Sequence, residues 1–81
     1  MLLFPNPASY QVIINYFVPL EFETCSINIF DLSGKEIIKQ VVPAEKTSFK
    51  MTTSNLASGS YIVKLYHKQD FLARGKLMII K

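Results

Sequence analysis

Residues 60–81, SYIVKLYHKQDFLARGKLMIIK, decide the fold class of this chain. Tyr61, Val63 and Leu65 fall at every second position, which is the period of a β-strand that buries one face. The polar triplet 68–70 then makes a tight turn, and a second β-rich run follows it to the end of the sequence. The pattern predicts an antiparallel pair of strands, with these three side chains directed into a core.

Similar runs of β-branched and aromatic residues, separated by turn residues, recur toward the N-terminus. The predicted strands are 2–4, 11–17, 21–32, 36–42, 47–52, 60–67 and 71–81. Seven short strands at a spacing of roughly ten residues are typical of an antiparallel sandwich. We therefore predict one all-β domain over residues 1–81, an immunoglobulin-like antiparallel β-sandwich of about seven strands.

The stretch 36–42, EIIKQVV, is the one segment whose pattern also fits a helix, because its apolar residues lie three and four positions apart. We predict a strand for three reasons. Four of its seven residues are β-branched, Gly34 would lie in the first turn of the helix, and Pro43 would end that helix after about two turns.

The composition is that of a small folded domain, with 49% hydrophobic and 19% charged residues among 81. The net charge of +3 is mild and no run of basic residues occurs, which argues against nucleic acid as the main partner. No apolar run approaches the ~20 residues of a membrane-spanning helix. Cys25 is the single cysteine, so a disulfide within the domain is excluded.

Residues suited to catalysis or metal binding are few. The chain has one histidine and one cysteine, fewer ligands than the roughly four of a structural zinc site, and no motif for a cofactor. Cys25 and His67 could form a nucleophile pair, but neither lies in a recognisable nucleophile context. We predict no enzymatic activity, no metal and no cofactor.

Lys64, Tyr66 and Lys68 alternate along one predicted strand face. Such interleaving of basic and aromatic side chains can stack single-stranded nucleic acid. A solvated outer face of a sandwich has the same pattern and is the interpretation that we prefer.

Near the N-terminus the sequence FPNPAS, residues 4–9, places prolines at positions 5 and 7. In a strand the N–H groups of residues i and i+2 point to the same side, so Pro5 and Pro7 would remove the donors from one edge. The sequence predicts an edge strand that can pair on one side only, a known protection against aggregation.

Four stretches together, LFPNPAS, INIFDLSGKEI, LASGSYIVKL and GKLMIIK, resemble the C-terminal sorting domain of proteins exported by the type IX (Por) secretion system of Bacteroidetes. The resemblance runs from one end of the chain to the other. It implies an immunoglobulin-like sandwich that forms the C-terminal part of a larger secreted protein.

The resemblance also implies which residues carry the family's motifs. These are Pro5, Asn6 and Pro7 in the first motif, Asp31, Gly34 and Lys35 in a hairpin turn, Gly59 and Tyr61 in a turn and strand, and Lys76 and Lys81 in the terminal motif. Tyr61 also has a purely structural interpretation, with its ring in the core and its hydroxyl on a nearby backbone group, as in a tyrosine corner.

The function implied by the resemblance is that of a secretion signal. The domain would direct its cargo from the periplasm through the outer-membrane translocon. A sortase-like cysteine protease would then remove it, and the cargo would be released or attached to the cell surface. We expect the receptor to recognise the last strand and its edge, by strand addition.

Three expectations remain open at this stage. The domain could form a homodimer, by pairing of edge strands or through Cys25. It could instead be an immunoglobulin-like accessory module that binds carbohydrate or protein, although the absence of tryptophan disfavours this. Finally, it could be an adhesive subunit that works by strand exchange.

Overall fold

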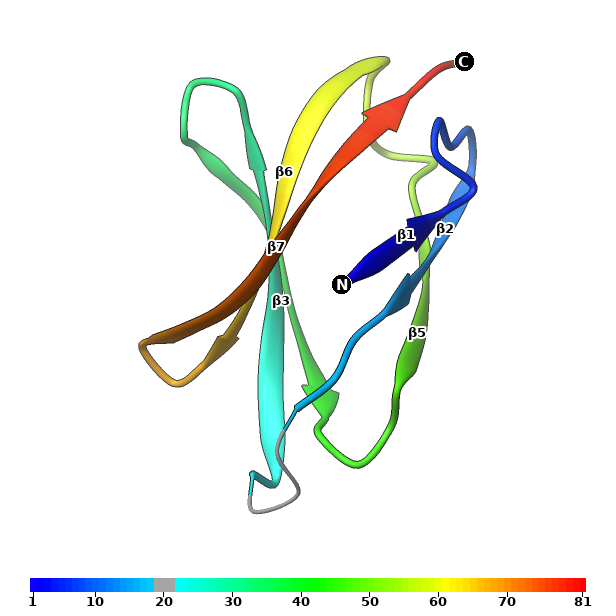
Figure 1. Cartoon of the computed structure of the whole chain (residues 1–81). Helices are drawn as coiled ribbons and strands as arrows, with labels where there is room; N and C mark the ends of the chain where they lie inside the picture. Colours follow the sequence, from blue (N-terminus) through cyan, green and yellow to red (C-terminus); the bar gives the residue numbers. More distant parts are fainter. Residues whose placement is uncertain (19–21) are drawn as a thin grey trace.

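A computed structural model describes residues 1–18 and 22–81, and in these ranges it contains seven β-strands and no helix (Figure 1). The strands are β1 (Leu2–Phe4), β2 (Gln11–Asn15), β3 (Thr24–Asp31), β4 (Glu36–Pro43), β5 (Ser48–Thr52), β6 (Gly59–His67) and β7 (Asp70–Ile79). The predicted all-β class is confirmed. The predicted strand at 36–42 is confirmed as β4.

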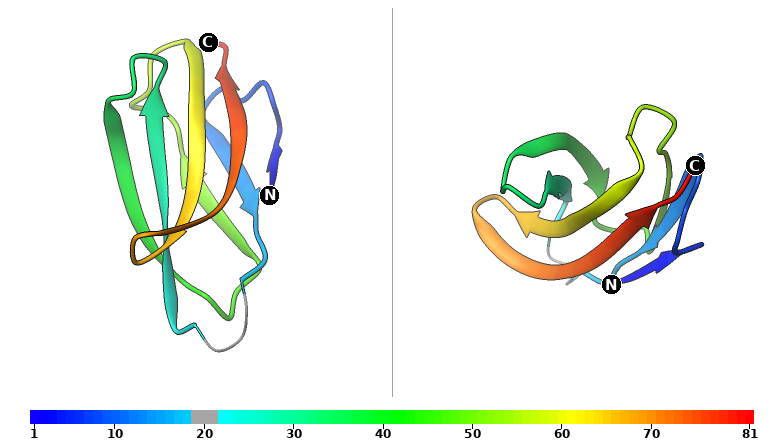
Figure 2. Two further views of the ribbon diagram at one scale, coloured as in Figure 1. Left: turned by 60° about the vertical axis from the view of Figure 1, so that its left-hand side comes forward. Right: turned by 90° about the horizontal axis from the view of Figure 1, so that it is seen from above.

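The strands form two antiparallel sheets that pack face to face (Figure 2). One has three strands in the order β1-β2-β5, and the other has four in the order β4-β3-β6-β7. This order resembles the immunoglobulin arrangement, with the fourth strand placed beside the third in the larger sheet. Consecutive strands β3 and β4, and β6 and β7, pair as hairpins.

Alternation along each strand creates the core between the two sheets. In β3, Cys25, Ile27 and Ile29 point inward, and in β6 Val63 and Leu65 do so from the neighbouring strand. The buried hydrophobic residues are Ala8, Val12, Ile14, Tyr16, Val18, Cys25, Ile27, Ile29, Val42, Ala44, Met51, Leu56, Tyr61, Val63, Leu65, Leu77 and Ile79. This is a thin core, because a domain of this size buries only about 60% of the surface of its unfolded chain.

The bounds of six of the seven predicted strands differ from the structure by one to three residues, and the strands predicted at 11–17 and 21–32 show why. The predicted strand 11–17 is longer than β2, which ends at Asn15. Tyr16 still points inward beyond the end of β2: its backbone N–H donates to Thr47 O and its hydroxyl to Pro43 O. The predicted strand 21–32 begins only at Thr24 in the structure, and Glu21 lies outside the described residues.

The core makes a first prediction about stability. Replacing Leu65, which is fully buried, by alanine (Leu65→Ala) should lower the free energy of unfolding by about 2–5 kcal/mol, because it removes buried methyl groups and leaves a cavity. The matched control is Leu32→Ala at a side chain that is 71% exposed, which should change it by less than about 0.5 kcal/mol. Equal losses in urea denaturation would contradict this placement of the core.

Candidate recognition site

The structure brings the motif residues to one end of the sandwich. The turn that follows Asp31, the loop before Gly59, the segment around Pro5 and Pro7, and the C-terminus all lie there (Figures 1 and 2). The register agrees, since Asp31 pairs with Tyr61, Gly59 with Ile79, and Ile79 with Ala8. Residues that are far apart in sequence therefore share one surface.

Asn6 connects the N-terminal segment to the last strand. Its side-chain amide donates from Nδ2 to Lys76 O at 2.8 Å, and its Oδ1 accepts from Met78 N at 3.0 Å. Two residues later the backbone makes the same pattern: Ala8 N donates to Met78 O at 2.8 Å, and Ala8 O accepts from Ile80 N at 2.9 Å. The carboxamide of Asn6 thus acts as a surrogate peptide group that extends a short parallel ladder.

The prediction that Pro5 and Pro7 lie in a one-sided edge strand is wrong. Strand β1 ends at Phe4, and both prolines lie in the bend that carries the chain from the smaller sheet to the edge of β7. Neither proline can donate a backbone hydrogen bond, so the side chain of Asn6 between them supplies the donor that the main chain lacks.

Ser9 and Tyr10 complete the closure between the two sheets. The Ser9 hydroxyl donates to Ile80 O at 2.8 Å, on the larger sheet. Its carbonyl accepts from Thr53 Oγ1 at 3.1 Å, and the Tyr10 carbonyl accepts from Thr53 N at 2.8 Å, just after β5 in the smaller sheet. Residues 6–10, which we call the N-terminal clamp, therefore bond to both sheets.

Lys81 is held at this end by three contacts. Its backbone N–H donates to Ser58 Oγ at 3.1 Å, and its Nζ donates to Ser54 O at 2.8 Å. The same Nζ lies 5.7 Å from the ring centroid of Tyr10, within the range of a cation–π interaction. Lys76 differs, because its backbone carbonyl is bonded to Asn6 while its side chain is exposed.

Asp31 organises the turn between β3 and β4. Its Oδ1 accepts from Ser33 Oγ at 2.6 Å, Ser33 N at 2.9 Å and Lys35 N at 3.0 Å. Gly34 has φ of +91°, a backbone conformation in which a side chain would be strained. The hydrogen bond from the Ser33 hydroxyl, followed by that from the Lys35 backbone, lowers the pKa of the Asp31 carboxyl from its ordinary value.

Tyr61 has the structural arrangement that its position after Gly59 suggested. The ring is buried in the core and the hydroxyl donates to Ala57 O at 2.6 Å, four residues upstream. The hydrogen bond holds the loop before β6 against the core. The role of Tyr61 is therefore structural, because its buried ring leaves little surface that a receptor could contact.

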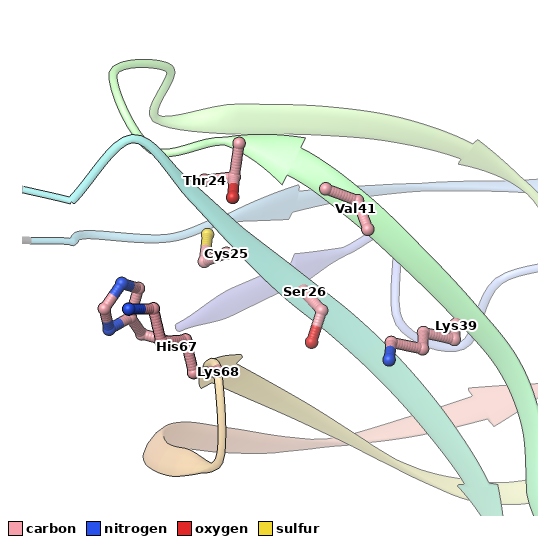
Figure 3. A pocket seen from close by; sticks show the side chains of 7 residues that line it. All are labelled: Thr24, Cys25, Ser26, Lys39, Val41, His67 and Lys68. Atoms are coloured by element: carbon pink, nitrogen blue, oxygen red, sulfur yellow. The ribbon is translucent and has the colours of Figure 1, made fainter.

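Cys25 and His67 line the same hollow at the opposite end of β3, yet they do not form a nucleophile pair (Figure 3). Burial raises the pKa of the Cys25 thiol, which opposes the thiolate that catalysis requires. His67 instead stacks on Phe22, with ring centroids 3.6 Å apart. Because Cys25 is only 3% exposed, a disulfide to a second copy would require the sheet to open locally.

Within residues 1–18 and 22–81, no group of three or more His, Cys, Asp or Glu side chains is placed to bind a metal ion. The same ranges contain no helix long and apolar enough to cross a membrane.

A comparison of the sequence with models of protein families gives one match. The family model described as the secretion system C-terminal sorting domain, which is the sorting domain of type IX secretion, matches residues 2–81. The chain belongs to this family. No curated protein matches it. A type IX sorting domain acts as a secretion signal, implies interaction with that secretion system, and implies a secreted or cell-surface cargo.

The sequence did not reveal which other residues of this sorting domain hold its motif end together. Ser54 and Ser58 anchor Lys81, and Thr53 anchors Ser9 and Tyr10. All three lie in the loop 53–58, where serine and threonine are ordinary turn residues. A single sequence gives no signal that distinguishes them from other loop residues, because their partners are far away in the chain.

The Asn6 ladder makes a testable prediction. Asn6→Ala removes both side-chain hydrogen bonds to β7 and should lower the free energy of unfolding by about 1–2 kcal/mol, measured by urea denaturation. The matched control is Asn55→Ala at an exposed loop position, expected to change it by less than about 0.5 kcal/mol. Equal stabilities of the two variants would show that the ladder contributes nothing.

The Asp31 turn makes a prediction about pH. Because the pKa of the folded state is lowered, the carboxylate stabilises the fold above the ordinary carboxyl pKa, and this contribution is lost as the pH falls through the folded value. An NMR titration should place the midpoint of Asp31 below the ordinary value. Ser33→Ala should raise that midpoint, since it removes the largest cause of the shift. An Asp31 midpoint that is the same in Ser33→Ala as in the wild type would contradict the role given to the Ser33 hydroxyl.

Proposed function

We propose that this domain forms the C-terminal end of a larger exported protein, and that its motif end is the surface by which the type IX translocon selects the cargo. The observation that carries the proposal is the ladder from Asn6 and Ala8 to β7, which joins the first and last motifs into one surface. Such a surface exists only when the domain is folded.

A folded signal suits the task of selecting unrelated cargoes. The N-terminal clamp and Lys81 bond to β7, to Ile80 and to the loop 53–58, so the contacts that shape this end lie within the domain. A recognition surface of this kind is portable between proteins. The motif side chains that are exposed, and so available to a receptor, are those of Pro5, Asn6, Pro7, Lys35, Lys76 and Lys81.

Strand addition at the end of β7 fits the structure less well than recognition of side chains. The carbonyl groups of Lys76, Met78 and Ile80 and the N–H groups of Met78 and Ile80 already bond to the N-terminal clamp. A receptor strand would have to displace that clamp. We propose that the receptor contacts the outside of the closed end instead.

The later steps of export rest on family membership alone. In this proposal the cargo crosses the periplasm and passes through the outer-membrane translocon. A sortase-like cysteine protease then cleaves upstream of β1, and the cargo is released or attached to the cell surface. The family of sorting signals is not an enzyme family, and the domain itself contributes recognition.

The alternative functions lack a supporting observation. Strand exchange between copies would need a free N-terminal segment, whereas Asn6 and Ala8 are paired within the chain. An accessory module for carbohydrate would use open aromatic faces side by side on one sheet, whereas on the outer face of the larger sheet the Tyr66 ring packs edge-on against Phe71 with centroids 6.0 Å apart.

A fusion protein tests the proposal. A signal peptide, a fluorescent protein and residues 1–81 are joined in that order and expressed in a bacterium that has the type IX system. We expect fluorescence at the surface or in the medium only when the translocon is intact. Removal of residues 76–81 should leave the reporter in the periplasm, because it removes the acceptors of the N-terminal clamp.

Two outcomes would contradict the proposal. One is a folded domain whose reporter stays in the periplasm of the intact strain. The other is full export of the shortened fusion.

A further inference from the structure

The outer face of the larger sheet carries a groove that none of the sorting motifs uses. In β3 the core-facing residues leave Ser26 and Asn28 pointing outward at its centre. These side chains are smaller than their cross-strand neighbours, which are Val41 and Lys39 on β4 and Tyr66 and Lys64 on β6. The result is a depression along β3, which we call the β3 groove.

Two adjoining hollows make up the β3 groove, and Ser26, Lys39 and Lys68 line both of them. Figure 3 shows Ser26 between Lys39 on one side and His67 and Lys68 on the other. Lys39 and Lys68 are exposed. The groove therefore has a polar floor and a lysine on each side.

Positive charge continues across the sheet beside the β3 groove. Lys39 pairs with Asn28, Asn28 with Lys64, and Lys64 with Arg74, so the three cations lie in one cross-strand row. Like charges directly opposite each other destabilise a sheet. An anionic partner would relieve the repulsion between Lys64 and Arg74.

Lys68 is held in an unusual conformation. Its φ is +56°, in the left-handed region that glycine and asparagine favour and that lysine seldom occupies. The turn thus keeps a lysine at the edge of the groove at some conformational cost.

Among the described residues that line the two hollows, one acidic side chain, Glu36, faces two lysines. Glu36 lies at one end of the groove, and its Oε1 accepts a hydrogen bond from Asn28 Nδ2. Asn28 Oδ1 accepts in turn from the Ser26 hydroxyl at 2.8 Å. This network fixes the floor, and within residues 1–18 and 22–81 no hydrogen bond engages the ammonium group of Lys39 or Lys68.

The aromatic side chains around the groove argue against a base or a sugar as the ligand. Lys64 Nζ lies over the Phe30 ring, 5.0 Å from its centroid, and the His67 ring is stacked on Phe22. Tyr66 is packed edge-on by Phe71. Nucleic acids and sugars bind such surfaces by stacking on free ring faces, and one face each of the Phe30 and His67 rings is already covered.

We infer that the β3 groove binds an acidic segment of a partner protein, an extended chain whose carboxylates pair with Lys39 and Lys68. The exposed apolar side chain of Val41, 59% accessible at the groove's rim, would contact the aliphatic residues between those carboxylates. This inference rests on the proposed function, because it assigns the partner to the type IX secretion system. It adds a second contact surface, separate from the motif end.

The test in solution uses the isotope-labelled domain and a synthetic peptide in which glutamate alternates with valine. The peptide should shift the backbone NMR signals of Ser26, Asn28, Tyr66 and Lys68. The same peptide with glutamine for glutamate should not. The double variant Lys39→Glu/Lys68→Glu should weaken binding by roughly tenfold or more, since two attractive pairs become repulsive.

The milder pair Lys39→Gln/Lys68→Gln should weaken binding by a smaller factor, which covers the case in which the double glutamate variant does not fold. The matched control is Lys46→Glu/Lys50→Glu, which makes the same charge change in the turn before β5 and on β5 and should leave the affinity unchanged. Equal shifts from both peptides, no shifts, or stronger binding of an oligothymidine would overturn the inference.

Export of the reporter fusion separates this inference from the proposed function. If the wild-type fusion is exported and Lys39→Glu/Lys68→Glu is retained, both stand. If both fusions are exported equally, the groove inference fails and the sorting function stands. If the wild-type fusion is not exported, the sorting function fails, and the peptide titration decides the groove by itself.

Discussion

The carboxamide of Asn6 on the backbone of β7 is the interaction on which the architecture of this sorting domain depends. The two sheets need a connection at their motif end, and the chain enters that region through a segment with prolines at positions 5 and 7, which cannot donate main-chain hydrogen bonds. The carboxamide of an asparagine between them offers an N–H donor and a carbonyl acceptor in one plane, as a peptide group does. It begins the ladder that Ala8 continues, over a separation of 70 residues between Asn6 and Lys76.

This closure matters because the domain has few other means of holding itself together. A core of this size gives little margin against the conformational entropy of the chain, and small domains usually add disulfides or metals. Here the lone Cys25 is buried and free. Hydrogen bonds from the N-terminal clamp and from Lys81 tie the chain ends to strands and loops of both sheets. The same hydrogen bonds therefore stabilise the fold and hold the motif end together. In the proposed function, a receptor for this end would select folded domains.

Much of the fold could be predicted from the sequence, because the period of two in segments such as 60–67 reports local burial. The strand at 36–42 was predicted correctly from β-branching and Pro43, against a competing helical spacing. Tyr61 was placed correctly for a similar reason, since a turn glycine followed by an inward tyrosine is a local pattern. The role of Asn6 could not be predicted, because its partners lie at the other end of the chain. Pro5 and Pro7 led instead to the prediction of a one-sided edge strand through them, whereas the structure has a bend there after β1.

The row of basic residues on the outer face of the larger sheet could be predicted only in part. Lys64 and Tyr66 were correctly expected to alternate with core residues, yet a single strand cannot show that Lys39 and Arg74 continue the same row. That row depends on the register between strands, which requires the fold. The motif residues themselves were predicted from a family resemblance. The structure places them at one end of the sandwich, so the motifs that define the family form one surface.

Native-state hydrogen exchange at the amides of β7 tests the central claim most directly. If the N-terminal clamp closes this edge, the amides of Met78 and Ile80, which donate to Asn6 and Ala8, should exchange as slowly as those in the centre of the larger sheet. The amide of the exposed edge residue Val41 on β4 provides the fast reference in the same spectrum. If the Met78 and Ile80 amides exchange as fast as the Val41 amide, the edge of β7 is open. That result would contradict the claim that the N-terminal clamp bonds to the last strand and so forms the motif end.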